Sequence, residues 1–82
     1  MPAGFFYVYI LRSIRGEHFY SGFTQDLAER LAHHNSGAEP HTAKYRPWRS
    51  KTAIAFSDRA QALAFERYLK TQSGRAFVKK RL

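Results

Sequence analysis

The first part of the chain contains two apolar stretches with the composition of β-strands. Residues 5–14 are rich in aromatic, β-branched and aliphatic side chains, Arg15-Gly16 interrupts them, and residues 17–22 continue in the same style. This pattern predicts a β-hairpin. If its turn has two residues, Tyr9 and Tyr20 project from the same face as near or diagonal neighbours.

The pattern changes to a helical period directly after the hairpin. Leu27 and Leu31 are four residues apart and are flanked by alanines, which predicts a short amphipathic helix with one apolar stripe. We expect Thr24 to be its N-cap, Asp26 to complement the helix dipole in the first turn, and Gly37 to end the helix.

The second half of the chain predicts a loop, a third strand and two further helices. These are expected at residues 36–51, at 52–56, from a cap at Ser57 or Asp58 to about Gln72, and at 75–82, with a break at Ser73-Gly74. A Ser-Gly pair and two prolines mark the loop. The predicted order of elements is β-β-α-β-α-α.

The length of 82 residues predicts a single domain, 1–82, near the lower size limit for one hydrophobic core. The chain has no cysteine, so its stability must come from packing, to which an aromatic content of 16% contributes. The apolar run at residues 5–11 is too short to span a membrane and follows no basic segment. We therefore expect a soluble, cytoplasmic protein with no membrane partner.

The charge of the chain is strongly positive. Fourteen Lys and Arg against six Asp and Glu give a formal net charge of +8. Such a field favours a polyanion, and nucleic acid in particular, through counterion release and steering. The alternative is a basic protein whose charge serves solubility or ribosome association. Charge by itself says nothing about catalysis.

Five polar residues have the composition of a site for phosphodiester chemistry: Tyr9, Tyr20, Arg30, His34 and Glu66. Arg30 and His34 are four residues apart and therefore share a helix face. A guanidinium can stabilise the charge of a phosphodiester transition state, and one carboxylate suffices for a Mg²⁺ ion that keeps most of its waters.

These residues, in this order, resemble the GIY-YIG nuclease domain, and in particular its small stand-alone, excinuclease-like bacterial branch. Tyr9 corresponds to the end of the first motif and Tyr20 to the start of the second, and the resemblance extends over almost the whole chain. The chain departs from the named motif at three positions: Tyr7 replaces Gly, and Val8 and Ser21 replace Ile.

The resemblance implies an α/β (α+β) fold around a small three-stranded antiparallel sheet. It implies hydrolysis of a nucleic-acid phosphodiester, with a divalent metal, Mg²⁺ or Mn²⁺, held by Glu66. Tyr9 is then the general base or a relay to one, with a nearby cation lowering its pKa. Tyr20 orients water or phosphate, and His34 positions water or Tyr9, or binds phosphate.

Each of these residues also has a plain structural interpretation. Arg30 can be an exposed helix residue paired with Asp26 or Glu29, and Glu66 can pair with Lys70 at i+4. The two tyrosines can be half-buried sheet residues, and His34 can lie on the surface.

A cationic and aromatic loop is the candidate nucleic-acid contact; its residues are Lys44, Tyr45, Arg46, Trp48 and Arg49. Arg and Lys can bind phosphates while Trp or Tyr stacks on an unpaired base. Equally, Pro47-Trp48 can close the core and leave only the charges to contact the substrate.

The sequence therefore predicts a metal-dependent endonuclease that cuts structured or single-stranded DNA in repair or recombination. No appended DNA-binding domain is predicted, so a protein partner can supply targeting. The alternatives are a non-catalytic nucleic-acid-binding module of the same fold, a nuclease that acts on RNA, and a partner-binding adaptor.

Overall fold

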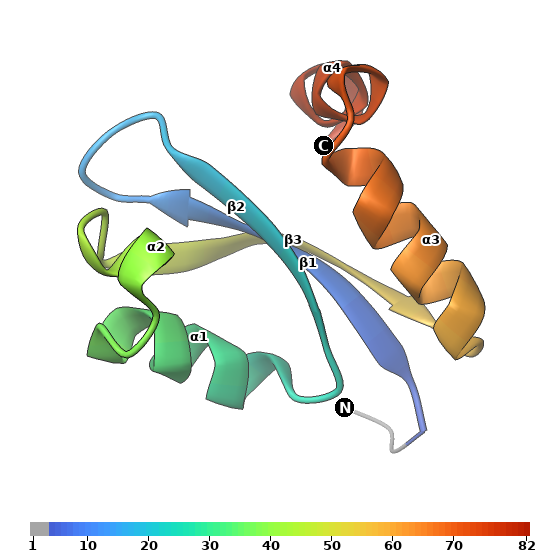
Figure 1. Cartoon of the computed structure of the whole chain (residues 1–82), viewed down its shortest axis with the longest axis horizontal. Helices are drawn as coiled ribbons and strands as arrows, with labels where there is room; N and C mark the ends of the chain where they lie inside the picture. Colours follow the sequence, from blue (N-terminus) through green and yellow to red (C-terminus); the bar gives the residue numbers. More distant parts are fainter. Residues whose placement is uncertain (1–3) are drawn as a thin grey trace.

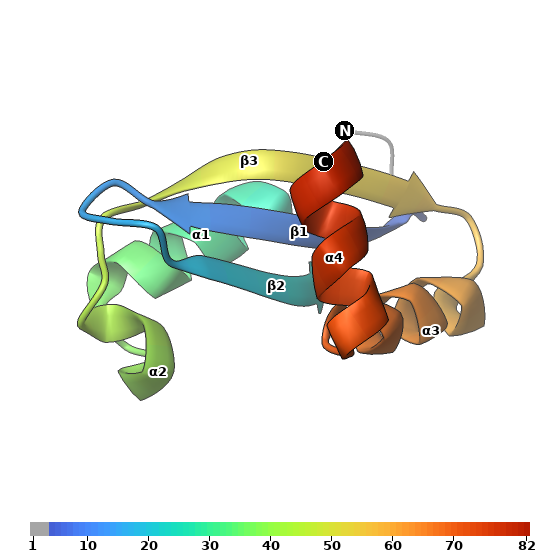
Figure 2. The ribbon, with the colours of Figure 1, turned by 90° about the horizontal axis from the view of Figure 1, so that it is seen from above.

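The computed structural model of the chain describes residues 4–82, in which three strands form one antiparallel sheet (Figure 1). The central strand is β1, and the order across the sheet is β2-β1-β3, which is seen from above in Figure 2. The elements in chain order are β1 (Phe6–Ser13), β2 (Phe19–Thr24), α1 (Leu27–Ser36), α2 (Pro40–Ala43), β3 (Trp48–Phe56), α3 (Arg59–Leu69) and α4 (Gln72–Arg81). The predicted fold class and element order are confirmed, with α2 as an addition.

The hairpin register places the two motif tyrosines on one face. Tyr9 pairs with Gly22, and Leu11 pairs with Tyr20, so Tyr9 and Tyr20 are diagonal neighbours. Residues 14–18 connect the strands, and the Ser13 amide still donates to the His18 carbonyl. The connection is thus wider than the predicted two-residue turn but keeps the predicted register, because Ser13 still lies opposite His18, as a two-residue turn at Arg15-Gly16 requires.

The two faces of β1 carry two separate apolar clusters. Val8 and Ile10 pack with Ala62 and Leu69 beneath α3 and α4. Leu11, with Tyr9 and Trp48, packs beneath α1; Figure 1 shows α1 and α2 on one side of the sheet and α3 and α4 on the other. Because side chains alternate along a strand, the tyrosines of β1 face the α1 layer.

The beginning of α1 differs from the prediction in its cap. Asp26, not Thr24, is the N-cap, and its carboxylate accepts from the Glu29 amide at 3.1 Å. Thr24 ends β2 instead, where its hydroxyl accepts from the Asp26 amide at 3.0 Å and fixes the tight connection. Gly37 ends the helix as predicted, with a left-handed φ of 83° that a side chain would disfavour.

The prediction of a continuous loop at residues 36–51 was wrong in two places. Pro40 begins the short helix α2, and β3 starts at Trp48 rather than at Thr52. Trp48 belongs to β3 because it pairs with Ser13 of the central strand. This extension lengthens the sheet toward the hairpin connection.

The predicted break at Ser73-Gly74 was also wrong. α3 ends at Leu69, Thr71 caps α4, and Gly74 lies inside α4. A Cβ on Gly74 would lie 1.9 Å from the Tyr68 carbonyl oxygen. Glycine is therefore needed here for the close approach of two helices rather than for a break. Across residues 4–82, no helix has the length and apolar character needed to span a membrane.

Candidate active site

A chain of hydrogen bonds connects β1, α1 and α2 in the protein interior. The Tyr9 hydroxyl lies 3.0 Å from His34 Nε2, and His34 Nδ1 lies 2.9 Å from the Thr42 hydroxyl. His34 is 0% exposed and Tyr9 is 3% exposed. The structural interpretation of His34 as a surface residue is therefore wrong, and so is its direct contact with phosphate, because the imidazole is covered.

The partners of Thr42 determine which nitrogen of His34 carries the proton. The Thr42 hydroxyl donates to the Glu39 carbonyl at 3.3 Å, so its lone pair is available to accept from His34 Nδ1–H. Burial, together with the nearby Arg30 charge, lowers the pKa of His34 and keeps the imidazole neutral. Nε2 is then an acceptor, and the Tyr9 hydroxyl donates to it.

Burial also determines the protonation of the tyrosine itself. It raises the pKa of Tyr9 above its ordinary value of 10.0, and the nearby Arg30 guanidinium only partly offsets this rise. Arg30 therefore does not bring the pKa of Tyr9 below its ordinary value, contrary to the prediction for that cation. A standing phenolate is disfavoured, whereas a phenol hydrogen-bonded to an imidazole can pass a proton onward.

Tyr20 completes an aromatic group around the imidazole. Its ring centroid lies 4.8 Å from that of His34 and 6.3 Å from that of Tyr9. Burial and the charge of Glu39 raise the pKa of Tyr20, so the phenol stays protonated and can donate a hydrogen bond. Tyr20 is only partly buried and so forms the outer side of the group.

Arg30 supplies the positive charge of this group. Interaction with the Tyr9 hydroxyl raises the pKa of Arg30, which stays cationic. Its Nε is buried and has no hydrogen-bond partner within residues 4–82, and no ion pair joins Arg30 to Asp26 or Glu29 in that range. A buried donor without a partner is costly in a folded protein, and a phosphoryl oxygen would satisfy it.

Glu66 approaches the group from the other side of the sheet, around the edge strand β2. Its carboxylate lies 3.4 Å from Lys70 Nζ, and that ammonium donates to the Ser21 carbonyl at 2.7 Å. Lys70 Nζ also lies 4.8 Å from the centre of the Tyr20 ring. The ion pair between Glu66 and Lys70 that the structural interpretation expected is therefore present. It lies at the edge of the candidate site.

The position of Glu66 fits a single-carboxylate metal site. Its side chain is 20% exposed, and its charge contributes to the raised pKa of both Tyr9 and Tyr20. No cluster of three or more His, Cys, Asp or Glu suited to a metal occurs in the described part of the chain. A hard cation that retains most of its waters needs only one or two carboxylates, so Glu66 can serve as its protein ligand.

The cationic and aromatic loop does not act as one surface. Trp48 is 3% exposed, its indole N–H donates to the Thr42 carbonyl at 2.8 Å, and Asn35 holds its backbone. The prediction that Trp48 stacks on a base is therefore wrong, because the ring fills the core. Tyr45 stacks on His18 at 3.8 Å between ring centroids. The cations remain exposed: Lys44, Arg46 and Arg49.

Three residues of the site have roles that the sequence interpretation did not assign. Thr42 orients His34, Lys70 joins Glu66 to the edge strand, and Gly22 leaves room for Tyr9. A Cβ on Gly22 would lie 2.4 Å from the Tyr9 hydroxyl oxygen. The hairpin register, with Tyr9 opposite Gly22, is the sequence signal that could have assigned this role.

Comparison of the sequence with known protein families identifies the family of this chain. Residues 5–81 match the model of the GIY-YIG catalytic domain. The chain therefore belongs to the GIY-YIG family, which is a family of nucleases. A protein of Lacticaseibacillus paracasei, named UPF0213 protein, is 39% identical over 69 residues, which span 83% of this chain and 76% of the relative. That name states no activity.

Proposed function

We propose that this chain is a metal-dependent endonuclease that hydrolyses phosphodiester bonds in nucleic acid. The observation that carries the proposal is the Tyr9–His34 hydrogen bond, in which a buried neutral imidazole accepts from a phenol beside Arg30. A permanently charged guanidinium and a proton relay are the two devices that phosphodiester cleavage by water requires.

Tyr9 acts as a relay in this mechanism. As water attacks phosphorus, the water proton passes to the Tyr9 oxygen while the phenol proton passes to His34 Nε2. This concerted route avoids a free phenolate, which burial disfavours. Thr42 holds the imidazole in the tautomer that can accept. The bond from phosphorus to the leaving oxygen breaks as the new bond forms, and the leaving oxygen takes a proton from solvent. The proton on His34 then returns through Tyr9 to solvent, and the pair is reset.

Arg30 and Glu66 act on the phosphate from two sides. The unpartnered Arg30 Nε donates to a non-bridging oxygen and stabilises the added charge of the transition state. Tyr20 donates to the same phosphate or to the attacking water. A Mg²⁺ or Mn²⁺ ion held by Glu66 would supply Lewis-acid stabilisation of the phosphate and the leaving oxygen.

The substrate we propose is DNA in a structured or single-stranded form, with repair or recombination as the process and the cytoplasm as the location. The net charge of +8 supports a polyanion. RNA is the second candidate substrate, since the relay and the guanidinium contact only the phosphodiester.

Cleavage of a labelled substrate panel tests this function. The panel comprises single strand, duplex, flap, three-way and four-way junctions and the matching RNAs, each with Mg²⁺, Mn²⁺ or EDTA. We expect metal-dependent products from the wild-type protein and none from Glu66→Ala, with binding in EDTA nearly equal for the two. Binding without products in any arm, by both proteins alike, would contradict the nuclease and leave a binding module of the same fold.

A further inference from the structure

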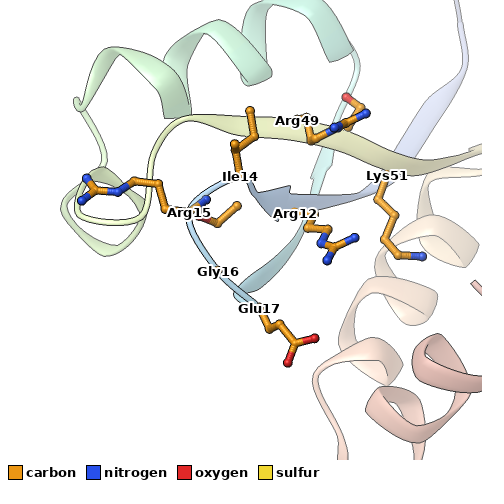
Figure 3. A pocket seen from close by; sticks show the side chains of 9 residues that line it. Arg12, Ile14, Arg15, Gly16, Glu17, Arg49 and Lys51 are labelled. Atoms are coloured by element: carbon orange, nitrogen blue, oxygen red, sulfur yellow. Dashed lines mark hydrogen bonds between the residues drawn. The ribbon is translucent and has the colours of Figure 1, made fainter.

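A hollow rich in basic side chains lies at the hairpin end of the sheet, on the face opposite α1. Its basic residues come from the end of β1, from the connection and from the start of β3: Arg12, Arg15, Arg49 and Lys51. Figure 3 shows Arg12 and Lys51 on the same open side of the strands, while Arg15 projects away beyond the turn. Arg12 pairs directly with Arg49 across the sheet.

A second groove continues from this hollow between the sheet and α4. Lys51 belongs to both. The basic residues added here are Lys70, Arg75 and Lys79. Tyr20 also lines this groove, and Lys70 contacts both the Tyr20 ring and Glu66. The groove therefore ends at the candidate active site.

The charged residues that line the hollow and the groove are almost all basic. Together the hollow and the groove hold seven of the fourteen Lys and Arg of the chain, but only one of its six acidic residues, Glu17. Lys51 is held by the carbonyl of Leu82 and Lys70 by Glu66, whereas Arg12 and Arg49 form no ion pair within residues 4–82. Adjacent unneutralised cations repel each other, and phosphates would relieve that repulsion.

An exposed aromatic ring stands beside these cations. Phe19 is 51% exposed on the edge strand β2, and the Arg12 guanidinium lies 6.0 Å from the centre of its ring. An exposed phenylalanine costs solvation free energy, whereas an unpaired base can stack on it. A basic groove that contains an aromatic platform is the arrangement that binds single strands.

The hollow and the groove together form one basic track from Arg12 and Arg49 to Lys70 and Arg75. We propose that a single-stranded segment of nucleic acid lies along this track. Phe19 stacks a base, and Arg12, Arg49 and Arg75 contact phosphates. The track leads the strand to Tyr20 and Glu66 from the face opposite Lys44 and Arg46. This inference rests on the proposed function for its destination, but binding to the track requires no cleavage.

Nucleic-acid binding measured in EDTA tests the track separately from cleavage, because EDTA removes the divalent metal that cleavage is proposed to need. The measurement is fluorescence anisotropy of a labelled oligothymidylate and of a duplex of equal length, over a range of salt concentrations. The test variant is Arg12→Gln/Arg49→Gln. The matched control is Arg59→Gln/Arg67→Gln, which removes the same charge from exposed positions on α3. Phe19→Leu tests stacking, and circular dichroism verifies that each variant is folded.

The track predicts that the test variant loses about 1.4 from the salt slope for single strands, and on the order of 20-fold in affinity at 0.1 M salt, since each lost contact accounts for about 0.7. The control should lose less than threefold. Phe19→Leu should weaken single-strand binding more than duplex binding. Equal losses in test and control, or no wild-type single-strand binding, would overturn the track. If the track variants lose binding but the wild-type protein never cleaves, the track stands and the nuclease proposal fails.

Discussion

The Tyr9 phenol and the His34 imidazole are joined by a 3.0 Å hydrogen bond, although 25 residues separate them in the chain. The bond joins the central strand to the last turns of α1. Neither side chain forms it at the surface, because both are buried. A phenol that donates to a neutral, covered imidazole has a proton acceptor within reach, and this relation determines most of the expected behaviour of the site.

Replacement of His34 by glutamine tests the relay. Gln can still accept a hydrogen bond from Tyr9 but cannot take up a proton. We expect His34→Gln to lower kcat by about 100-fold or more, with little change in substrate affinity in EDTA. Thr42→Val should cause a smaller loss, because it removes only the bond that orients the ring. Full activity of His34→Gln would restrict His34 to a positioning role.

The pH dependence of cleavage follows from the lowered pKa of His34. Burial is the main cause of that shift, so the imidazole stays neutral somewhat below its ordinary value of 6.5. We expect kcat to be level above pH 6.5 and to fall at lower pH, where His34 becomes protonated and cannot accept. A profile that rises only near the ordinary tyrosine value of 10.0 would indicate a phenolate base instead.

The same shift affects stability. His34 takes up a proton in the unfolded chain at a higher pH than in the folded protein, so the free energy of unfolding is fully present above pH 6.5 and decreases as pH falls below it. Denaturant unfolding at neutral and at mildly acidic pH should show a smaller decrease for His34→Gln than for the wild-type protein. An equal decrease in both would contradict a buried neutral imidazole.

Gly22→Ala should remove most of the proposed cleavage activity without unfolding the protein. The added methyl group would lie 2.4 Å from the Tyr9 hydroxyl oxygen, so the ring must move away from His34. Gly16→Ala is the matched control, since its methyl group meets His18 only at an ordinary 3.4 Å. We expect a loss of activity of about 100-fold for Gly22→Ala and almost none for Gly16→Ala, measured under single-turnover conditions. Comparable activity in both would mean that Tyr9 needs no such alignment.

Trp48 should contribute to stability rather than to binding. Its ring lies in the core beneath α1 and donates to Thr42, so Trp48→Leu should lower the free energy of unfolding by about 2–4 kcal/mol. The folded fraction should bind nucleic acid like the wild-type protein. Chemical denaturation and anisotropy measure the two quantities. If Trp48→Leu bound nucleic acid more weakly but were as stable as the wild-type protein, Trp48 would stack on a base after all.

The hairpin and the polar set were predictable because their signals are local. Runs of aromatic, β-branched and aliphatic residues predicted the strands, and the wider connection left Ser13 opposite His18 and Tyr9 opposite Gly22. Arg30 and His34 share a helix face through their four-residue spacing. These features depend on short stretches of sequence and on the period of a strand or helix.

The remaining features depend on contacts between distant segments. Trp48 belongs to β3 because it pairs with Ser13 of β1 and its backbone N–H donates to the Asn35 side chain. Both partners are distant from Trp48 in the sequence. Gly74 lies within a helix because α3 passes close to it. The pKa of Tyr9 depends on its burial between the sheet and α1. Such effects have no local signature, and so the predictions of the loop, of the break and of an Arg30-lowered Tyr9 pKa were wrong.

The most direct test of the account compares two tyrosines of the central strand. Tyr7 and Tyr9 are both buried, and they project from the same face because they are two residues apart. Within the described range the Tyr7 hydroxyl has no hydrogen-bond partner, so Tyr7→Phe should leave stability and cleavage unchanged or slightly improve stability.

The measurement is single-turnover cleavage of the best substrate by wild type, Tyr9→Phe and Tyr7→Phe, with Mg²⁺ or Mn²⁺ present. We expect a loss of about 100-fold or more for Tyr9→Phe and wild-type cleavage for Tyr7→Phe. Full cleavage by Tyr9→Phe would contradict the relay from water through Tyr9 to His34.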